Sequence, residues 1–318
     1  MTTTRPTRLG LAAILASVAL LAGCAGAPAA APAAQQERAA ASVALPAATV
    51  CDDAIVSTTS YAPAPGAATP SVDAIRARGA LRVGVSADTL LMGSRNPLSG
   101  QIEGFDIDML HAVSTAIFGD PNRLQFRVIT SAQRLEVLEN HEVDLVARTF
   151  TINCERWETI AFSAEYLTAG QKVLVTRDSE AQSIEDLEGL GDQRVCAPEG
   201  TTTLERLEET YPGVEAVSAP THTGCLVLFQ QGKVDAITGD DTILAGFAAQ
   251  DPYAKVVGEA FSAEPYGVGV AADQVDLVQY VNGVLDQAKA DGTWAASYDR
   301  WLGALGTAPA PPVSVYGR

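Results

Sequence analysis

Apolar and polar positions divide the chain into a short apolar leader, a long stretch without periodicity, and a region where apolar runs alternate with amphipathic segments. The leader, residues 9–21, follows Arg5 and Arg8. It is too short to span a membrane, which takes about 20 apolar residues, and is typical of a signal peptide. Residues 25–71 are mostly Ala, Pro, Ser and Thr, a composition that indicates a flexible tether. Folded sequence is expected from about Val72.

Strands and helices are predicted to alternate throughout the folded part. The predicted strands are residues 81–85, 126–129, 143–146, 171–175, 194–197, 234–238 and 266–270. The predicted helices are residues 106–118, 135–138, 202–211, 224–231, 241–249, 277–288 and 294–302. This alternation favours an α/β fold with mainly parallel sheets.

The second half of this pattern resembles the first. Residues 142–146 (Glu-Val-Asp-Leu-Val) are echoed by residues 233–237 (Lys-Val-Asp-Ala-Ile). The length fits two α/β lobes of about 100 residues each. Ligands of open α/β sheets bind beyond the carboxyl ends of strands, so the segments that follow each echo, residues 147–156 and 238–241, are the first places to search.

The end of the leader indicates the compartment. Residues 21–24 (Leu-Ala-Gly-Cys) resemble the lipobox of bacterial lipoproteins, in which Cys24 is lipidated and becomes the mature N-terminus. The alternative is an ordinary signal peptide with an incidental cysteine. We expect residues 1–23 to be removed and the chain to be lipid-anchored on the extracytoplasmic face of the cell membrane.

Charge excludes one class of partner. The chain has 21 basic and 38 acidic residues and a net charge of −17. A chain this acidic does not bind nucleic acid through a general phosphate field, and we expect contact with the membrane only through the anchor. An anionic ligand would need a few local cations.

Four cysteines besides Cys24 indicate disulfides in an oxidising compartment. Three pairings are possible, and we favour Cys196–Cys225 within one lobe and Cys51–Cys154 fastening the N-terminal arm. A loop of roughly 30 residues closed in this way contributes about 3–4 kcal/mol on the chain-entropy estimate. No metal-binding spacing occurs in the sequence, so no metal is expected.

The segment after the first echo carries cations and hydroxyls. Arg148, Thr149, Thr151 and Arg156 follow a predicted strand end, and a guanidinium can bind a carboxylate through two parallel hydrogen bonds. The alternative is a surface loop with incidental arginines.

The second lobe offers an anion and a helix N-terminus. Asp240 and Asp241 end a strand and open a helix; one would cap the helix and the other would receive an ammonium group. Thr201 and Thr202 open another helix, whose amides favour anions, although plain capping is an alternative. Together these elements suit a free amino acid.

At this point a family resemblance is clear. The chain from residue 75 to 306 resembles the family 3 extracellular solute-binding proteins of ABC transporters, and more narrowly the glutamine/glutamate-binding lipoproteins of actinobacteria. The matching segments are residues 81–85, 104–109, 149–156, 161–163, 200–202, 232–237, 241–246, 265–269 and 291–294.

The resemblance implies a two-lobed periplasmic-binding-protein-like fold of type II, with two hinge crossovers and a ligand cleft between the lobes. It implies that Arg156 holds the α-carboxylate, that Thr149 and Thr151 bond the carboxylate and ammonium, that Thr201 or Thr202 bonds from the second lobe, and that Asp240 receives the ammonium. The expected domains are a leader (residues 1–23), a tether (24–72), lobe 1 (73–171 and 263–306), lobe 2 (172–262) and a tail (307–318).

The side-chain preference is read from the remaining cations. The family places aromatic residues after the first strand, whereas residues 86–92 contain none. Arg95 and Arg148 are spare cations near the expected cleft and candidate partners for a side-chain carboxylate. Within the glutamate, aspartate and glutamine class that the resemblance implies, they favour glutamate or aspartate over arginine or histidine.

Three functions compete. The leading one is a monomeric, cofactor-free binding protein that delivers an amino acid to an ABC permease. A second is a sensor that signals through a membrane protein. A third is a lyase or dehydratase on the same fold, against which His111, His141 and His222 have no paired nucleophile in the sequence.

Overall fold

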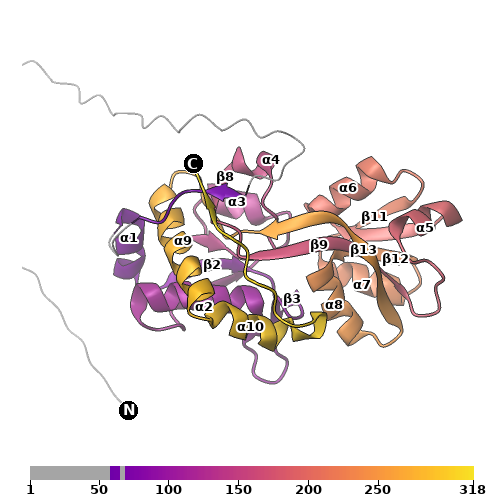
Figure 1. Cartoon of the computed structure of the whole chain (residues 1–318), viewed down its shortest axis with the longest axis horizontal. Helices are drawn as coiled ribbons and strands as arrows, with labels where there is room; N and C mark the ends of the chain where they lie inside the picture. Colours follow the sequence, from indigo (N-terminus) through magenta and orange to yellow (C-terminus); the bar gives the residue numbers. More distant parts are fainter. Residues whose placement is uncertain (1–57, 65–68) are drawn as a thin grey trace, which may run out of the picture. The chain divides into compact units, whose positions relative to one another are not determined.

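The computed structural model describes residues 58–64 and 69–318, which contain two five-stranded sheets flanked by helices (Figure 1). None of the helices in these ranges combines the length and the apolar character that a membrane crossing requires. Cys24, the leader and most of the expected tether lie outside the described residues, so the lipid anchor stays a prediction.

The first sheet has the order β6-β2-β7-β14-β8. β2 pairs in parallel with β6 and β7, whereas β14 is antiparallel to β7 and β8. Its strands are β2 (Leu81–Val85), β6 (Leu124–Val128), β7 (Leu145–Val146), β8 (Ile160–Phe162) and β14 (Gly269–Ala271). We call this sheet with helices α1–α4, α9 and α10 lobe 1.

The second sheet has the order β11-β10-β12-β9-β13 and repeats this plan. β10 pairs in parallel with β11 and β12, and β9 is antiparallel to β12 and β13. Its strands are β9 (Leu167–Thr176), β10 (Arg194–Pro198), β11 (Glu215–Ala219), β12 (Ala236–Asp240) and β13 (Ala254–Tyr266). We call this sheet with α5–α8 lobe 2. The two sequence echoes lead into β7 and β12, which hold the same place in the two sheets.

The chain crosses between the sheets twice. It leaves lobe 1 after β8 and enters β9, and it returns from β13 to β14. β9 and β13 run side by side from Leu167↔Tyr266 onward (Figure 1). The single strand predicted over residues 266–270 is wrong: Tyr266 belongs to the second sheet and Gly269 to the first, because the chain changes sheets between them.

Five of the described helices begin where the sequence supplies a capping side-chain oxygen. Thr69, Asn153, Ser183, Thr201 and Thr221 each accept a backbone amide of the first turn. The helices are α1 (Pro70–Arg78), α2 (Phe105–Phe118), α3 (Arg134–Glu139), α4 (Cys154–Trp157), α5 (Ile184–Leu190), α6 (Thr202–Thr210), α7 (His222–Gln230), α8 (Asp241–Gln250), α9 (Val275–Ala290) and α10 (Thr293–Trp301), followed by a 3₁₀ turn at Gly303–Leu305.

Aromatic side chains fill the core of lobe 1 where α2 meets α10. Phe105 stacks on Tyr166 and meets Trp294 edge to face, with ring centroids 6.2 and 5.8 Å apart. The Trp294 indole donates to the Tyr166 carbonyl at 2.6 Å. This packing fixes the start of α2 against the start of hinge strand β9.

Part of the expected tether and tail is ordered. β1 (Thr59–Ser60) pairs in parallel with β15 (Val315–Tyr316), and Ser60 is buried, donating its hydroxyl to the Phe162 carbonyl. α1 begins at Pro70. These residues belong to lobe 1, although they begin in or fall within the ranges that the sequence assigned to tether and tail. No sign of the β1–β15 pairing appears in the sequence, because pairing between distant segments leaves no local period of apolar residues. A small antiparallel sheet, β3 (Asp88–Thr89), β4 (Gly93–Arg95) and β5 (Ile102–Glu103), completes the lobe.

The disulfide Cys196–Cys225 joins β10 to α7, with Cα atoms 5.6 Å apart. Cys154 is disulfide-bonded as well. Its expected partner Cys51 lies outside the described residues, so the second pairing stays a prediction.

Candidate functional site

A small cavity is enclosed by residues of both lobes, at the ends of β7 and β12. Lobe 1 contributes the end of β7 and the start of α3, and lobe 2 contributes the starts of α6, α7 and α8. The lining residues are Arg134, Thr149, Thr151, Thr201, Thr202, Thr203, His222 and Asp240. Five of them are residues that the sequence singled out.

Asp240 and Asp241 have different roles although they are adjacent. Asp240 is buried; its Oδ2 accepts a hydrogen bond from the Tyr266 hydroxyl at 2.5 Å, and its Oδ1 has no partner among the described residues. Asp241 accepts from the backbone amides of Thr242 and Gly170. The lining carboxylate of the pair is therefore Asp240, and Asp241 is a structural residue at the helix start.

Burial raises the pKa of Asp240 well above its ordinary value, and the nearby charge of Glu264 raises it further. The hydrogen bond from Tyr266 and the charge of Arg134 act in the opposite direction. A cationic group placed at Oδ1 would stabilise the ionised form.

Thr149 lies on an unusual backbone. Its φ is +41°, a left-handed conformation that is rare for a β-branched residue, and its amide donates to Asp106 Oδ2 at 2.8 Å. Asp106 Oδ1 accepts from the Tyr166 hydroxyl at 2.6 Å. Burial raises the pKa of Asp106 to about 6, although both hydrogen bonds oppose that shift. Asp106 therefore holds the loop that presents Thr149 and Thr151.

Arg156 lies beside the cavity, on the short helix α4 that Asn153 caps. Its Nη1 donates to the Thr151 carbonyl at 2.6 Å, and its Nη2 is 3.5 Å from the Gly200 carbonyl of lobe 2. No carboxylate lies within ion-pair distance of its guanidinium among the described residues. It is a buried cation held by carbonyl groups next to the cavity.

Arg134 is a lining residue that the sequence reasoning missed. Its guanidinium donates to the Thr149 carbonyl at 3.0 Å and to the Gly200 carbonyl at 2.8 Å, and it lies 4.4 Å from the Phe150 ring centroid. Burial lowers its pKa, and so do the charges of the neighbouring arginines. The signal was available: Arg134 follows β6, another strand that ends at the same edge of the sheet.

His222 is a second missed residue. It opens α7 and is buried, and its Nδ1 has no hydrogen-bond partner in the described part of the chain. Burial, with the charges of Arg148 and Arg134, lowers its pKa to about 3, so the imidazole is neutral at physiological pH. The sequence offered no pattern that separates it from an ordinary buried histidine.

The two spare arginines do not lie where the sequence suggested. Arg95 is exposed on the β4–β5 hairpin and donates to the Gly100 carbonyl of the same hairpin at 2.7 Å. Arg148 is fully buried; its Nε donates to the Ile129 carbonyl and its Nη1 to Ser131 Oγ. Neither lines the cavity. Arg95 extends into solvent on a hairpin, and Arg148 fastens the chain that follows β6.

The threonines of lobe 2 combine capping with lining. Thr201 Oγ1 caps α6 by accepting the Leu204 amide, and it donates to the Pro198 carbonyl at 2.6 Å. Thr202 Oγ1 donates to Glu264 Oε2 at 2.7 Å. Capping, the alternative that the sequence left open, is observed for Thr201, and both side chains still face the cavity.

The model of one known family matches residues 81–304, and its description is bacterial extracellular solute-binding proteins, family 3. This range covers both five-stranded sheets and every residue that lines the cavity. The chain belongs to this family.

Similar proteins support the assignment of this chain to the solute-binding protein family. It is 36% identical over 219 residues to an ABC transporter glutamine-binding protein of Bacillus subtilis (strain 168), covering 69% of this chain and 80% of the relative. It is 34% identical over 227 residues to a glutamate-binding protein of Corynebacterium glutamicum, covering 68% and 76%.

A solved structure gives the same fold. It is an ancestral amino acid-binding protein, described as a precursor of cyclohexadienyl dehydratase. The match has a TM-score of 0.67 and 31% identity, and it covers 73% of this chain and 99% of the other.

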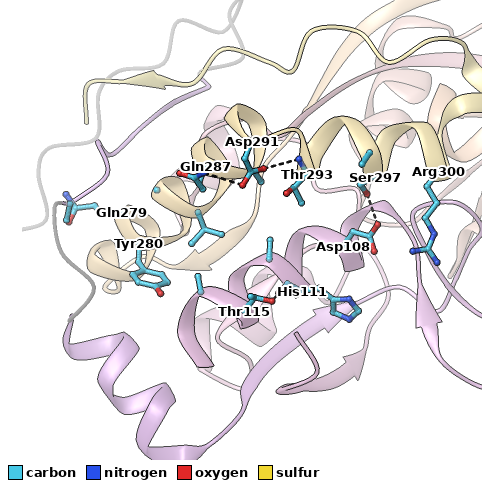
Figure 2. A pocket seen from close by; sticks show the side chains of 17 residues that line it. Asp108, His111, Thr115, Gln279, Tyr280, Gln287, Asp291, Thr293, Ser297 and Arg300 are labelled. Carbon is cyan, nitrogen blue, oxygen red and sulfur yellow. Dashed lines mark hydrogen bonds between the residues drawn. The ribbon is translucent and has the colours of Figure 1, made fainter. Parts of the chain in front are cut away.

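A larger groove of the solute-binding protein lies elsewhere, between α2, α9 and α10 of lobe 1 (Figure 2). Polar groups along it bond one another: Gln287 Nε2 and the Thr293 amide donate to Asp291, and Ser297 donates to Asp108 (Figure 2). Its apolar part is lined mostly by small side chains. None of the predicted ligand residues lines this groove, so the small cavity between the lobes is the better candidate site.

Proposed function

We propose that the protein captures a free amino acid between its two lobes and delivers it to an ABC permease. The observation that carries this proposal is the unpartnered Oδ1 of Asp240, which faces a cavity flanked by the buried guanidinium groups of Arg134 and Arg156. The zwitterion of a free amino acid needs both an anion and a cation in its binding site. The names of the Bacillus and Corynebacterium relatives support the same ligand class.

Arg156 is assigned to the α-carboxylate and Asp240 to the ammonium group. Arg156 is buried, and among the described residues its guanidinium bonds only carbonyls, so an arriving carboxylate would gain two charge-assisted hydrogen bonds without displacing one of their carboxylates. The hydroxyls of Thr149, Thr151, Thr201 and Thr202 complete the shell.

For the ligand side chain we propose an acidic group, bound by Arg134 and His222. Both line the cavity, and the His222 Nδ1 is a buried polar atom with no partner among the described residues. A buried cation favours glutamate or aspartate over glutamine, because a carboxylate compensates its charge and an amide does not. Arg134 and His222 thus take the role for which the sequence suggested Arg95 and Arg148.

We further infer binding without turnover, attachment through lipidated Cys24, and a monomeric state. Most of the lining side chains are threonines, and the buried His222 has no nucleophile bonded to its Nδ1. Conversion of a prephenate-like substrate by the purified protein would contradict the first inference. Co-purification of a signalling protein without transport subunits would favour a sensor over delivery.

The test is a thermal-shift screen of the mature protein against the twenty amino acids, followed by calorimetry of each ligand that raises the melting temperature. A ligand that binds only the folded state raises apparent stability. We expect L-glutamate and L-aspartate to give the largest shifts. No shift with any amino acid at millimolar concentration would overturn the proposal.

A matched pair of variants separates the site from the fold. Asp240→Asn removes the charge that faces the cavity and is expected to weaken glutamate binding at least about a hundredfold. Asp241→Asn changes the adjacent carboxylate, which accepts from the backbone amides of Gly170 and Thr242 and does not line the cavity, and is expected to bind as wild type does. Equal losses in both variants would contradict the assignment of Asp240.

A further inference from the structure

Tyr266 lies at a structural junction next to the candidate site. It is the last residue of β13, where it pairs with Leu167 of β9, and it forms an isolated bridge with Thr151 of lobe 1. Its side chain is fully buried, and its ring centroid is 6.3 Å from that of Tyr166. The backbone of Tyr266 is therefore held by hinge strand β9 and by the loop that lines the cavity, and its ring lies against that of Tyr166.

The hydroxyl of Tyr266 fixes the orientation of Asp240. It lies 2.5 Å from Asp240 Oδ2 and 3.1 Å from Thr242 Oγ1. It is the one donor to the Asp240 carboxylate within the described ranges. One carboxylate oxygen is thus bound to the hinge and the other is left for the cavity.

We propose that Tyr266 is a positioning residue for ligand binding: its hydroxyl holds Oδ2 of Asp240 and so aims Oδ1 at the ligand ammonium. This inference rests on the proposed function, because it assigns to Asp240 the role of ammonium acceptor. Tyr266 itself does not line the cavity, so it acts through Asp240.

Several groups around Asp240 disfavour its ionised form, and a hydrogen-bond donor to its carboxylate counteracts them. The negative charges of Glu264 on β13 and Asp241 on α8 disfavour the ionised form of Asp240. Among the described groups that favour the ionised form, the Tyr266 hydroxyl is the one that bonds the carboxylate directly. The remaining favourable charges come from Arg134 of α3 and from Arg156 of α4, whose own charge is stabilised by Asp240. Burial raises the pKa of Asp240, and the Tyr266 hydrogen bond lowers it.

The sign of the pH effect follows from these contributions. Ammonium binding requires ionised Asp240, so affinity falls as the pH falls through the pKa of Asp240. Removing the hydroxyl removes a contribution that lowers this pKa. In Tyr266→Phe the loss of affinity on acidification therefore begins at a higher pH than in the wild-type protein.

The experiment combines calorimetry with an NMR titration. With L-glutamate as the probe at neutral pH, Tyr266→Phe is expected to bind on the order of 10- to 100-fold more weakly, and its pH profile is expected to shift upward. A carbon-13 NMR titration of the Asp240 carboxyl in the free protein is expected to show a higher pKa in Tyr266→Phe. The NMR measurement needs no ligand.

Tyr166→Phe is the matched control. It removes the neighbouring buried hydroxyl, whose partner Asp106 does not line the cavity, and it is expected to leave the titration of Asp240 unchanged. An unshifted Asp240 pKa in Tyr266→Phe, or an equal shift in both variants, would overturn the proposal. If wild type binds no amino acid, the proposed function fails, and the NMR titration alone decides the role of Tyr266.

A double variant keeps the test valid if Tyr266→Phe does not fold. In an Asp240→Asn background a neutral amide replaces the carboxylate, so no buried charge loses its donor. If Tyr266 acts through Asp240, adding Tyr266→Phe to Asp240→Asn weakens glutamate binding by less than twofold. A further loss as large as that expected in the wild-type background would show that Tyr266 acts by another route.

Discussion

At the residue scale, burial and hydrogen-bond partners together separate the arginine beside the cavity from the other two that the sequence offered. The sequence offered Arg95, Arg148 and Arg156 as cations near one site. Arg95 is exposed, Arg148 is bonded to the chain after β6, and Arg156 is a buried cation beside the cavity. The same residue type thus has three different environments, because the fold decides which groups surround each guanidinium.

Arg156→Ala is expected to weaken glutamate binding at least about a hundredfold. A buried ligand carboxylate left without its charged partner loses on the order of 3 kcal/mol. Calorimetry of the purified variant measures the change. Arg95→Ala removes an arginine from the exposed hairpin and is the control, with wild-type affinity expected. Undiminished binding by Arg156→Ala would remove Arg156 from the site.

At the element scale, glycine lets helix α8 approach lobe 1. Gly246 lies in the middle of α8, and a Cβ built on it would be 2.6 Å from the Leu90 carbonyl oxygen. Such a distance is not tolerated, so a side chain here would push α8 away from lobe 1. On the other side of the cavity, a Cβ on Gly200 would be 2.6 Å from the Ala132 Cα.

Gly246→Ala is expected to weaken ligand binding about tenfold, because the lobes cannot close fully around the ligand. Gly189→Ala is the matched control: this glycine also lies in a helix of lobe 2, and a Cβ there would contact nothing within 4 Å. Alanine in an open helical position contributes up to about 1 kcal/mol of stability. Calorimetry and thermal unfolding of both variants check this. Wild-type affinity in Gly246→Ala would mean that the Leu90 contact is not needed for closure.

At the scale of the whole lobes, a polar contact joins β3 to the first turn of α7. The Thr223 hydroxyl lies 2.8 Å from Asp88 Oδ2 and 3.0 Å from the Asp88 carbonyl. Asp88 belongs to lobe 1 and Thr223 to lobe 2, next to His222. We expect this contact to stabilise the closed form and to couple it to the residue assigned to the ligand side chain.

Thr223→Val keeps the shape of the side chain and removes the hydroxyl. A hydrogen bond to a charged group contributes about 1.5–3 kcal/mol, so glutamate should dissociate roughly 10- to 100-fold faster. Stopped-flow measurement of the dissociation rate tests this. Thr115→Val is the control, because the Thr115 hydroxyl donates to a carbonyl within its own helix. Dissociation as slow as wild type in Thr223→Val would exclude the contact as a latch.

Several features followed from local sequence. The alternation of short apolar strands with amphipathic helices gave the α/β class, and the echo of residues 142–146 in 233–237 matched the equivalent strands β7 and β12. Thr201 and Asp240 were found because each lies where a strand gives way to a helix. Polar residues are frequent at such positions, because the first backbone amides of a helix have no partner within the helix.

Other features depended on tertiary structure. Tyr266, Asp106, Arg134 and His222 are polar residues in ordinary sequence surroundings, and they gain a role because distant segments bring a partner or a cavity to them. The pairing of β1 with β15 also joins residues about 250 positions apart, without a local signal. The sequence by itself determined the class of fold and the family, and it pointed to five residues that line the candidate cavity. The residue pattern left the adjacent aspartates equivalent and the family resemblance pointed to Asp240; the tertiary structure supplied the physical reason, because Asp240 is buried beside the cavity and accepts the hydroxyl of a residue in another strand.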